Sequence, residues 1–343
     1  MGVINKVVEV CGDRYVAGYS IPQGLDVIAR IVDEGYFVSL DFLGENATSL
    51  ETADLSLEKY HDVIDLVGER FEFGDFPNEV PVSISVKPSS ICQVYEMGAF
   101  GHDGKGETIA FSLDTPLESR LREIVHATDQ IGSVVTLDME DHRYTDDSLN
   151  VVKSILAEDM RPGVLGNVLQ SRLDRTLGDV GSLVADITDP GSLILPKGRP
   201  RARVCIGIYN EDANIATQSK KVAKQRLMRH VETLLKGGFY VEIATHDKNV
   251  IKTLQEEVLP KYSATQYEFQ FLLGVPVAEH KLAPALRDLG ETVRFYAPIQ
   301  YQDGSGVLYM KRRLWENKGM VLSGMTTLGR SSMAKEHRKK LAA

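Results

Sequence analysis

The feature that most constrains this chain of 343 residues is a repeated unit, in which a short apolar run precedes a longer segment with helical spacing. The apolar runs are rich in β-branched residues, which is typical of buried strands. Eight runs are present, at residues 37–42, 82–87, 134–139, 166–170, 203–208, 240–244, 268–272 and 293–297. Strands that alternate with helices pair in parallel, and eight such units close a (βα)8 barrel. The sequence therefore predicts an α/β fold of the TIM-barrel type, with an open doubly wound sheet as the alternative.

The segments around the repeats predict three regions along the chain. Residues 1–34 form an N-terminal extension ending in a helix at 23–34, residues 35–320 form the barrel, and residues 321–343 form a C-terminal tail. Amphipathic spacing predicts helices at 117–131, 147–157, 213–236, 248–258 and 278–289, and a final helix at 307–317 over the barrel mouth. The glycine-rich stretch 98–108 predicts a loop, and the basic end of the tail, 333–343, is expected to fray.

Composition excludes several other classes of protein. Apolar residues make up 43% of the chain and charged residues 25%, which suits a globular core and argues against disorder. A net charge of −9 opposes binding to nucleic acid. The three cysteines are far apart and show neither a zinc-site spacing nor a disulfide framework. No apolar stretch is long enough to span a membrane and no leader pattern begins the chain, so we expect a cytoplasmic protein.

Polar side chains gather at the predicted carboxyl ends of the strands, where barrel enzymes carry their active sites. These side chains are Lys87, Asp138, Glu140, Asp141, Gln170, Tyr209, Thr245, His246 and Tyr296. His246 has no second histidine at another strand end, so the pattern argues against a metal centre. We expect the carboxylates at 138, 140 and 141 to form an ion-pair network that orients cations.

Three cations predict an anion-binding site at the barrel mouth. Arg312 and Arg313 lie in the predicted final helix, and with Lys87 they would form a pocket that captures a carboxylate or phosphate. Glu316 stands four residues beyond Arg312 and can hold that arginine in place. Lys87 alone also suits Schiff-base chemistry, as in an aldolase, which remains an alternative.

The same strand ends carry a family resemblance that covers approximately residues 15–317. Its pieces are VKPSS at 86–90, LDMED at 137–141, VLQ at 168–170, ATHD at 244–247, EFQ at 268–270, YAP at 296–298 and RRLWEN at 312–317. In this order and spacing, the chain resembles the proline dehydrogenases, and in particular the monofunctional bacterial type.

The resemblance implies a distorted (βα)8 barrel with the final helix over the mouth and FAD across the strand ends. It also implies an oxidoreductase that converts L-proline to Δ1-pyrroline-5-carboxylate by hydride transfer to flavin, in proline catabolism. The electrons would then pass to a quinone acceptor, which would require transient contact with a membrane surface.

The resemblance also implies roles for individual residues. Lys87, Arg312 and Arg313 would hold the proline carboxylate, with Glu316 in support. Tyr296 would pack beside the proline ring and Tyr209 would line the pocket. Asp138 would orient the cationic groups, and Arg203 would reach the flavin near its hydride-accepting nitrogen. The residues that would hold FAD are Met139, Gln170, Arg203, Ile206, Gly207, Ile208, Thr245 and His246.

Two departures from the family pattern concern the cofactor region. The family usually has Lys-Gly-Ala-Tyr where this chain has Ile-Gly-Ile-Tyr at 206–209, and a tyrosine is common where Leu273 stands. These differences leave two alternatives open. One is oxidation of a related cyclic amino acid in a specialised pathway, and the other is a non-catalytic sensor that binds proline or flavin.

Overall fold

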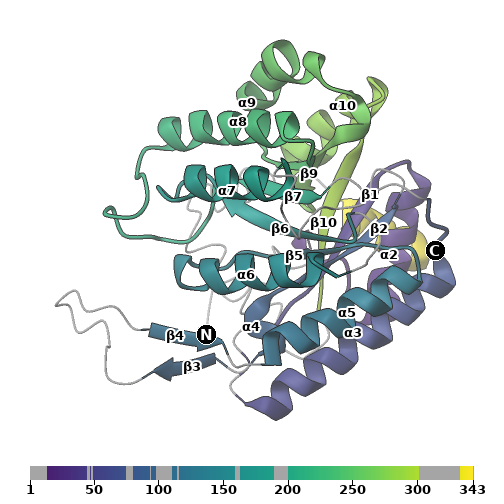
Figure 1. Cartoon of the computed structure of the whole chain (residues 1–343). Helices are drawn as coiled ribbons and strands as arrows, with labels where there is room; N and C mark the ends of the chain where they lie inside the picture. The colour runs from purple at the N-terminus through teal and green to yellow at the C-terminus, as the bar shows by residue number, and fades with distance from the viewer. Residues whose placement is uncertain are drawn as a thin grey trace, which may run out of the picture.

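Eight strands join in the order β1–β10–β9–β8–β7–β6–β5–β2, and β2 pairs with β1 to close a barrel (Figure 1). The computed structural model describes residues 14–44, 47, 49–74, 80–92, 94–97, 110–113, 116–158, 163–188, 200–300 and 333–342. The barrel strands are β1 (Phe37–Phe42), β2 (Val82–Val86), β5 (Val135–Leu137), β6 (Leu165–Gln170), β7 (Arg201–Cys205), β8 (Tyr240–Ala244), β9 (Tyr267–Leu272) and β10 (Val293–Ile299). All eight pairings are parallel, so the carboxyl ends of the strands meet at one rim, the barrel mouth. The predicted α/β barrel is confirmed.

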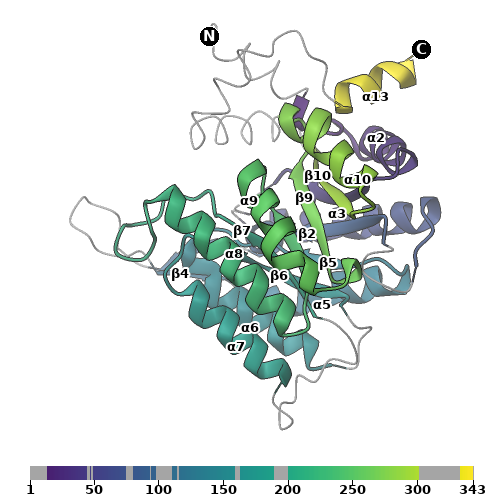
Figure 2. The same cartoon turned by 90° about the horizontal axis from the view of Figure 1, so that it is seen from above.

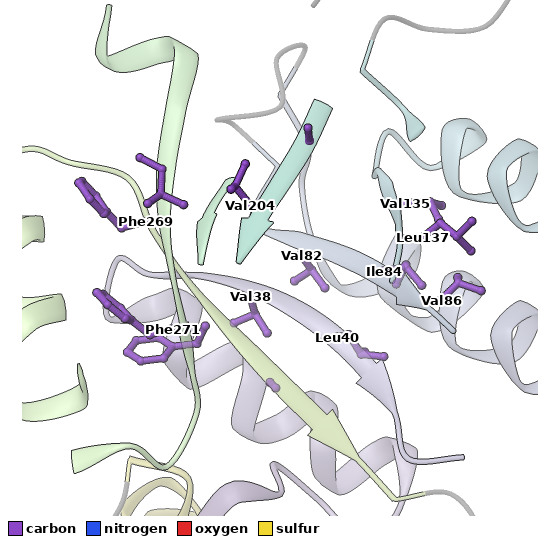
Figure 3. Packing of buried hydrophobic residues seen from close by; sticks show 14 of the residues in the cluster. Val38, Leu40, Val82, Ile84, Val86, Val135, Leu137, Val204, Phe269 and Phe271 are labelled. Atoms are coloured by element: carbon purple, nitrogen blue, oxygen red, sulfur yellow. The ribbon is translucent and has the colours of Figure 1, made fainter. Parts of the chain in front are cut away.

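The barrel strands alternate between apolar and polar side chains. In β2, Val82, Ile84 and Val86 belong to the buried hydrophobic cluster, whereas Ser83 and Ser85 point the opposite way. The apolar set packs between strands and helices, and Figure 3 shows it around Val38, Leu40, Val82, Ile84, Val86, Val135, Leu137, Val204, Phe269 and Phe271. The polar set faces the barrel interior, because its members bond to one another across strands that are not neighbours. The interior of this barrel is therefore a polar core.

Helices follow the strands and cover the outside of the barrel (Figure 2). The α-helices are α2 (Ile21–Asp33), α3 (Leu50–Arg70), α4 (Pro88–Ile91), α5 (Pro116–Gln130), α6 (Thr145–Leu156), α7 (Thr176–Thr188), α8 (Lys220–Lys236), α9 (Lys248–Thr253), α10 (Ala283–Asp288) and α13 (Met333–Ala342). Short 3-10 turns lie at η2 (His142–Tyr144), η4 (Leu259–Lys261) and η5 (Ala264–Gln266), and π-helical turns at η3 (Leu254–Val258) and η6 (Ala278–Leu282). Across the described ranges, no helix combines the length and apolar character that crossing a membrane requires.

Side-chain caps explain where several helices begin. The Ser20 hydroxyl accepts from the backbone N–H of Gln23 at the start of α2. Ser219 caps α8 in the same way, so this helix begins at Lys220 and not at residue 213 as the periodicity predicts. The preceding residues form a turn, in which Asn214 N–H donates to Asp212 Oδ1 at 2.8 Å. The predicted helix 213–236 is therefore too long at its N-terminus.

Strand β7 differs most from its predicted limits of 203–208. It begins at Arg201 and ends at Cys205, and Gly207 then has φ +93°. A left-handed residue of this kind interrupts an extended strand. The backbone consequently leaves the sheet before Ile208, and Tyr209 lies in the loop at the mouth.

Two predicted segments lie outside the described residues. The loop 98–108 falls between β3 (Val94–Met97) and β4 (Ala110–Leu113), which pair as an antiparallel hairpin that leaves the rim of the barrel (Figure 1). The final helix 307–317 also falls outside, and with it Arg312, Arg313 and Glu316.

The C-terminal end is a packed helix, contrary to the frayed tail that its basic composition suggested. In α13, Met333, Ala334 and His337 are buried. The helix lies beside α2 (Figure 2), and the Met333 N–H donates to Glu279 Oε2 at 3.1 Å. A spacing of three to four residues places the buried side chains on one helix face, which explains why this segment is ordered despite its lysines.

Candidate active site

Four of the predicted residues meet at the barrel mouth. Lys87 follows β2, Asp138 follows β5, Arg203 lies in β7 and Tyr296 lies in β10. The Tyr296 hydroxyl donates to Asp138 Oδ2 at 2.6 Å, and Arg203 donates to Asp138 Oδ1 at 2.6 Å. The Arg203 guanidinium also stands over the Tyr296 ring, 5.4 Å from its centroid. Strands β5, β7 and β10 are not neighbours, so these contacts cross the barrel.

Lys87 is held by partners on two other strands. Its ammonium forms an ion pair with Asp41 of β1, which is completely buried. It also donates to the carbonyl of Phe42 at 3.2 Å and to the Tyr296 hydroxyl at 3.5 Å. The three hydrogens of the ammonium therefore have three acceptors, and the ion pair with Asp41 favours the charged form.

Arg203 makes contacts with all three of its guanidinium nitrogens. Nε donates to Glu242 Oε2 at 3.0 Å, and the terminal nitrogens donate to Asp138, Ser85 and Ser39. Burial alone would lower the pKa of Arg203, but the charges of Glu242 and Asp138 raise it above its ordinary value. Arg203 is therefore a permanently positive group at the mouth.

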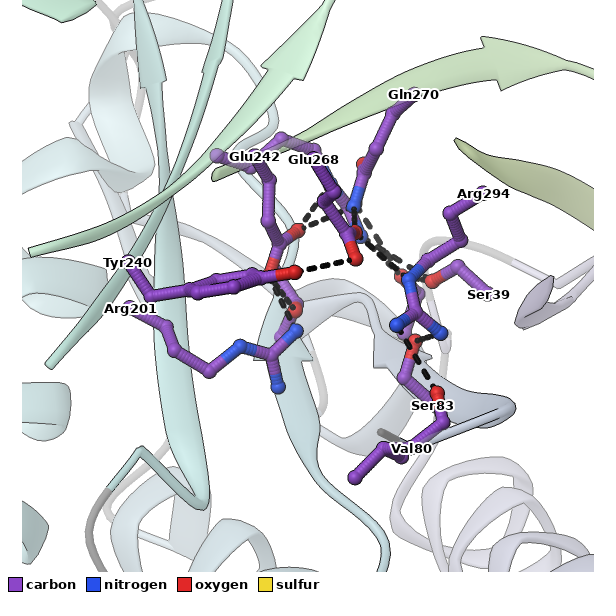
Figure 4. Close-up of polar contacts among 12 residues, drawn as sticks. Ser39, Val80, Ser83, Arg201, Tyr240, Glu242, Glu268, Gln270 and Arg294 are labelled. Carbon is purple, nitrogen blue, oxygen red and sulfur yellow. Dashed lines mark hydrogen bonds and ion pairs between the residues drawn. The ribbon is translucent and has the colours of Figure 1, made fainter. Parts of the chain in front are cut away.

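From Glu242, the partner of Arg203, the ion pairs continue to Arg201, Glu268 and Arg294 (Figure 4). Glu242 pairs with Arg201, and Glu268 pairs with Arg294 at 2.7 Å. Gln270 joins the two pairs, because its amide donates to Glu242 at 2.7 Å and to Glu268 at 2.6 Å. One polar network thus runs from the mouth through the barrel interior.

The residues predicted to hold a cofactor line the strand ends from β5 to β8. Gln170 donates through Nε2 to the carbonyl of Glu140 at 2.6 Å, whereas its buried Oε1 has no partner among the described residues. Gly207 packs so closely against this side chain that a Cβ would lie 2.6 Å from Oε1. Met139 and Thr245 are buried and Ile206 is partly buried, whereas Ile208 is exposed.

His246 and Tyr209 complete this part of the rim. The His246 ring accepts from the backbone N–H of Leu272 at Nε2, at 2.9 Å, which fixes its orientation. The carbonyl of Tyr209 accepts from Arg172, and Glu211 of the same loop lies 2.6 Å from His142 Nδ1. The loop after β7 is therefore tied to the segment that follows β5.

The acidic residues after β5 have separate partners. Asp138 binds Arg203, and Asp141 binds Arg143 two residues further along at 2.8 Å. Glu140 accepts from the backbone N–H and the hydroxyl of Ser89, at 2.9 and 2.7 Å, at the start of α4. Within the described ranges, no group of three or more His, Cys, Asp or Glu side chains is arranged to hold a metal ion.

Sequence reasoning missed the polar residues inside the strands. Asp41 and Glu242 are completely buried and directly support Lys87 and Arg203, yet neither stands at a predicted strand end. The available signal was the alternation of polar and apolar residues within each run. Leu273, a noted departure, is buried in the hydrophobic cluster.

The chain is similar to known proteins along most of its length. A family model described as proline dehydrogenase matches residues 25–194. A proline dehydrogenase from Deinococcus radiodurans is 31% identical over 317 residues, which cover 91% of this chain and 89% of the relative. Proline dehydrogenase 1 of Bacillus subtilis (strain 168) is 27% identical over 317 residues, with the same coverage of 91% and 89%.

Solved structures share the fold. Proline utilization A from Bdellovibrio bacteriovorus, inactivated by N-propargylglycine, has a TM-score of 0.75 at 21% identity, covering 96% of this chain and 34% of that chain. Proline utilization A from Bradyrhizobium japonicum has a TM-score of 0.66 at 22% identity, covering 89% of this chain and 30% of that chain. This chain thus spans about a third of the length of these structures. The extent and identity of the Deinococcus radiodurans match show that the chain belongs to the proline dehydrogenase family.

Proposed function

We propose that this chain is a flavin-dependent enzyme that oxidises L-proline to Δ1-pyrroline-5-carboxylate in proline catabolism. The observation that carries the proposal is the hydrogen-bonded cluster of Lys87, Asp138, Arg203 and Tyr296 at the barrel mouth, in a member of the proline dehydrogenase family. Barrel enzymes place their chemistry at this rim. A barrel mouth with fixed charges of both signs suits a small substrate that carries a carboxylate and an amine.

The rim from β5 to β8 fits a flavin. Gln170 Oε1 is a buried acceptor without a partner among the described residues, and a flavin ring offers an N–H donor for such a group. Gly207 has no side chain, so the Gln170 amide can pack directly against its backbone; a Cβ there would lie 2.6 Å from Oε1 and would displace the acceptor. We propose that FAD is held here by Met139, Gln170, Arg203, Ile206, Gly207, Ile208, Thr245 and His246. When bound, it would supply the hydride acceptor.

The cations of the mouth would bind the substrate. Arg312 and Arg313 would clamp the proline carboxylate together with Lys87, and Glu316 would hold Arg312 in position. Tyr296 would pack beside the ring, and Tyr209 would line the pocket from the loop after β7. The ammonium hydrogens of Lys87 already have acceptors on the protein. Lys87 would therefore attract the proline carboxylate through its positive charge as well as by direct contact.

Asp138 and Arg203 would be the catalytic residues. Hydride transfer leaves the reduced flavin richer in electrons, and a permanent positive charge beside it favours that state. Arg203 has this charge, and Asp138 fixes it in place while accepting from Tyr296. The proline nitrogen must also lose its proton, and the low dielectric of a closed mouth favours the neutral amine.

Schiff-base chemistry on Lys87 is less consistent with the site. A nucleophilic lysine must be neutral, whereas the buried ion pair with Asp41 stabilises the ammonium. Failure to trap a substrate adduct on Lys87 with borohydride would agree with this argument.

We propose a barrel region at 35–320, an N-terminal extension at 1–34 and a C-terminal region at 321–343. Electrons would pass from the flavin to a quinone, with transient contact between the protein and a membrane surface. L-proline would be the substrate, although a related cyclic amino acid would suit the same clamp.

Turnover with a quinone analogue tests the proposal. The purified, FAD-loaded protein should reduce a water-soluble quinone analogue only when L-proline is added, and a cyclic imine product should form in equal amount. A panel of cyclic amino acids should show the highest kcat/KM for L-proline. Tight proline binding without quinone reduction would instead favour the sensor, and a higher kcat/KM for another ring would reassign the substrate.

A further inference from the structure

Glu242 has more partners than an ordinary structural carboxylate. It lies in β8 with no exposed surface, and its register neighbours are Arg203 in β7 and Glu268 in β9. Its carboxylate accepts from four side chains, which are Arg201, Arg203, Gln270 and Thr136. None of the predicted roles includes this residue, although it touches a proposed catalytic arginine directly.

Glu242 in β8 and Asp138 after β5 both bind the Arg203 guanidinium. Glu242 accepts from Nε at 3.0 Å, and Asp138 accepts from a terminal nitrogen at 2.6 Å. The hydroxyls of Ser85 and Ser39 occupy the other donors, at 3.2 Å each. A guanidinium is planar and its donors have fixed directions, so two carboxylates on different sides determine its orientation. Only Asp138 would remain as a charged partner if Glu242 were neutral.

The charge of Glu242 is permanent under ordinary conditions. Burial alone would raise its pKa, but the charges of Arg201 and Arg203 lower the pKa to about 2. In a water-free interior, a charge at hydrogen-bond distance acts much more strongly than it would in water. Glu242 therefore reduces the net positive charge that Arg203 presents to the mouth at every working pH.

We infer that Glu242 is a positioning residue for the reaction, which orients the Arg203 guanidinium toward Asp138 and limits its effective positive charge beside the flavin. The inference rests on the proposed function, because it takes Arg203 to lie beside the flavin. Replacing Glu242 with a neutral side chain removes one negative charge near the cofactor. Reduced flavin is then favoured, so the reduction potential of the bound flavin should rise.

Glu268 provides a matched control within the same network. It is equally buried, stands beside Glu242 in the register of β8 and β9, and shares the Gln270 amide. Its charged partner is Arg294 at the bottom of the barrel, and it reaches Arg203 only through Gln270 and Glu242. A purely structural role for Glu242 would make the two carboxylates equivalent.

The test compares Glu242→Gln and Glu268→Gln as FAD-loaded full-length proteins. The flavin potential is measured by anaerobic reduction with a chemical reductant and a reference dye, and thermal unfolding is recorded in parallel. We expect Glu242→Gln to increase the equilibrium constant for flavin reduction at least tenfold, which is about 30 mV for a two-electron couple. Both variants should lose stability, but the potential of Glu268→Gln should equal that of the wild type. Glu242→Asp, which keeps the charge, should restore the wild-type potential.

The outcomes separate this inference from the proposed function. Equal potentials in Glu242→Gln and Glu268→Gln would overturn the inference and leave Glu242 a structural residue. If Glu242→Gln does not fold, the double variant Arg201→Met/Glu242→Gln removes both members of the buried pair and leaves neither unpaired. Glu242 contacts Arg203 directly, whereas Arg201 contacts Glu242, so the potential of the double variant should still rise, although by less than in the single variant. An unchanged value would overturn the inference. Wild-type flavin that proline cannot reduce would overturn the proposed function alone, because the chemical titration does not use proline. Wild-type protein that binds no flavin would overturn both.

Discussion

The buried charges that the described strands place inside the barrel are paired with charges of opposite sign. The cations are Lys87, Arg201, Arg203 and Arg294, and the carboxylates are Asp41, Asp138, Glu242 and Glu268. Among the described residues, these four cations and four carboxylates balance in charge, and an unpaired charge in the interior would cost several kcal/mol. Substitution of one member therefore affects both stability and the site, so matched controls are essential for experiments on this network.

Removal of the Tyr296 hydroxyl should weaken catalysis without removing the ring. Tyr296→Phe loses the donor to Asp138 and the acceptor for Lys87. Because a hydrogen bond to a charged group contributes about 1.5 to 3 kcal/mol, kcat/KM for proline should fall at least about tenfold. Anaerobic stopped-flow flavin reduction over a range of proline concentrations measures the change.

Tyr240→Phe is the control for that substitution. The Tyr240 hydroxyl donates to Glu268 at 2.9 Å, within the same network but toward the bottom of the barrel. Its loss should lower the stability and leave kcat/KM for proline unchanged. A similar kcat/KM in Tyr296→Phe and wild type would contradict the role assigned to the Tyr296 hydroxyl.

The sequence predicted that Lys87, Asp138, Arg203 and Tyr296 meet at the barrel mouth. It did not predict the buried carboxylates inside the strands that pair with Lys87 and Arg203. Residues at strand ends can be found by locating apolar runs, because the ends of parallel strands meet at one rim. Asp41 and Glu242 lie inside the apolar runs and not at their ends. Their positions follow from the alternation of the strand, but their partners come from distant strands and only the closed barrel brings them together.

At the scale of single elements, the strands were more predictable than the segments between them. The limits of β1 and β8 agree with the sequence prediction, since β-branched apolar runs bounded by polar residues define buried strands well. The loop from β7 to α8 was mispredicted at both ends. Gly207 ends strand β7 earlier than predicted, and the cap at Ser219 makes helix α8 begin later than predicted. Both limits depend on local backbone geometry, which the spacing of apolar residues does not reveal.

Gly207→Ala should disturb the loop after β7 and the proposed flavin site. The residue has φ +93°, and a Cβ would lie 2.6 Å from Gln170 Oε1. The strain should lower the free energy of unfolding by about 1 to 3 kcal/mol and raise the Kd for FAD. Urea unfolding and flavin titration of the apoprotein measure the two effects.

Gly181→Ala is the matched control in helix α7. A Cβ there meets nothing within 4 Å, and alanine favours a helix interior over glycine. This variant should gain about 0.5 to 1 kcal/mol and bind FAD normally. Unchanged FAD affinity in Gly207→Ala would argue against a flavin beside Gln170.

At the scale of the whole molecule, two features hold the fold together: the closed barrel and the packing of the C-terminal helix α13 against α2. Eight parallel strands leave no free edge in the barrel, and the apolar cluster links the barrel to the surrounding helices. Composition alone wrongly suggested a frayed C-terminus, because α13 is stabilised by a buried face and by Glu279, both contributed by tertiary structure. The regions proposed for 1–34 and 321–343 remain predictions.

Overall stability should depend on the neutral form of His230. Burial, with Arg226 and Arg229 nearby, lowers the pKa of His230 from 6.5 to about 4. Between pH 6.5 and about 4, His230 is protonated in the unfolded chain but stays neutral in the native protein. The free energy of unfolding therefore decreases as the pH falls through this range. Over that interval, the difference in unfolding free energy between wild type and His230→Asn should change by about 3 kcal/mol. Urea unfolding at several pH values measures it, with the exposed His126→Asn as control.

The visible absorption spectrum of the purified protein, recorded without oxygen, tests the proposed reaction most directly. Bands of oxidised flavin should be present after reconstitution with FAD and should bleach when L-proline is added. This result would establish the cofactor and the reaction class in one experiment. Flavin that remains oxidised at saturating proline, or a protein that binds no flavin, would contradict the account.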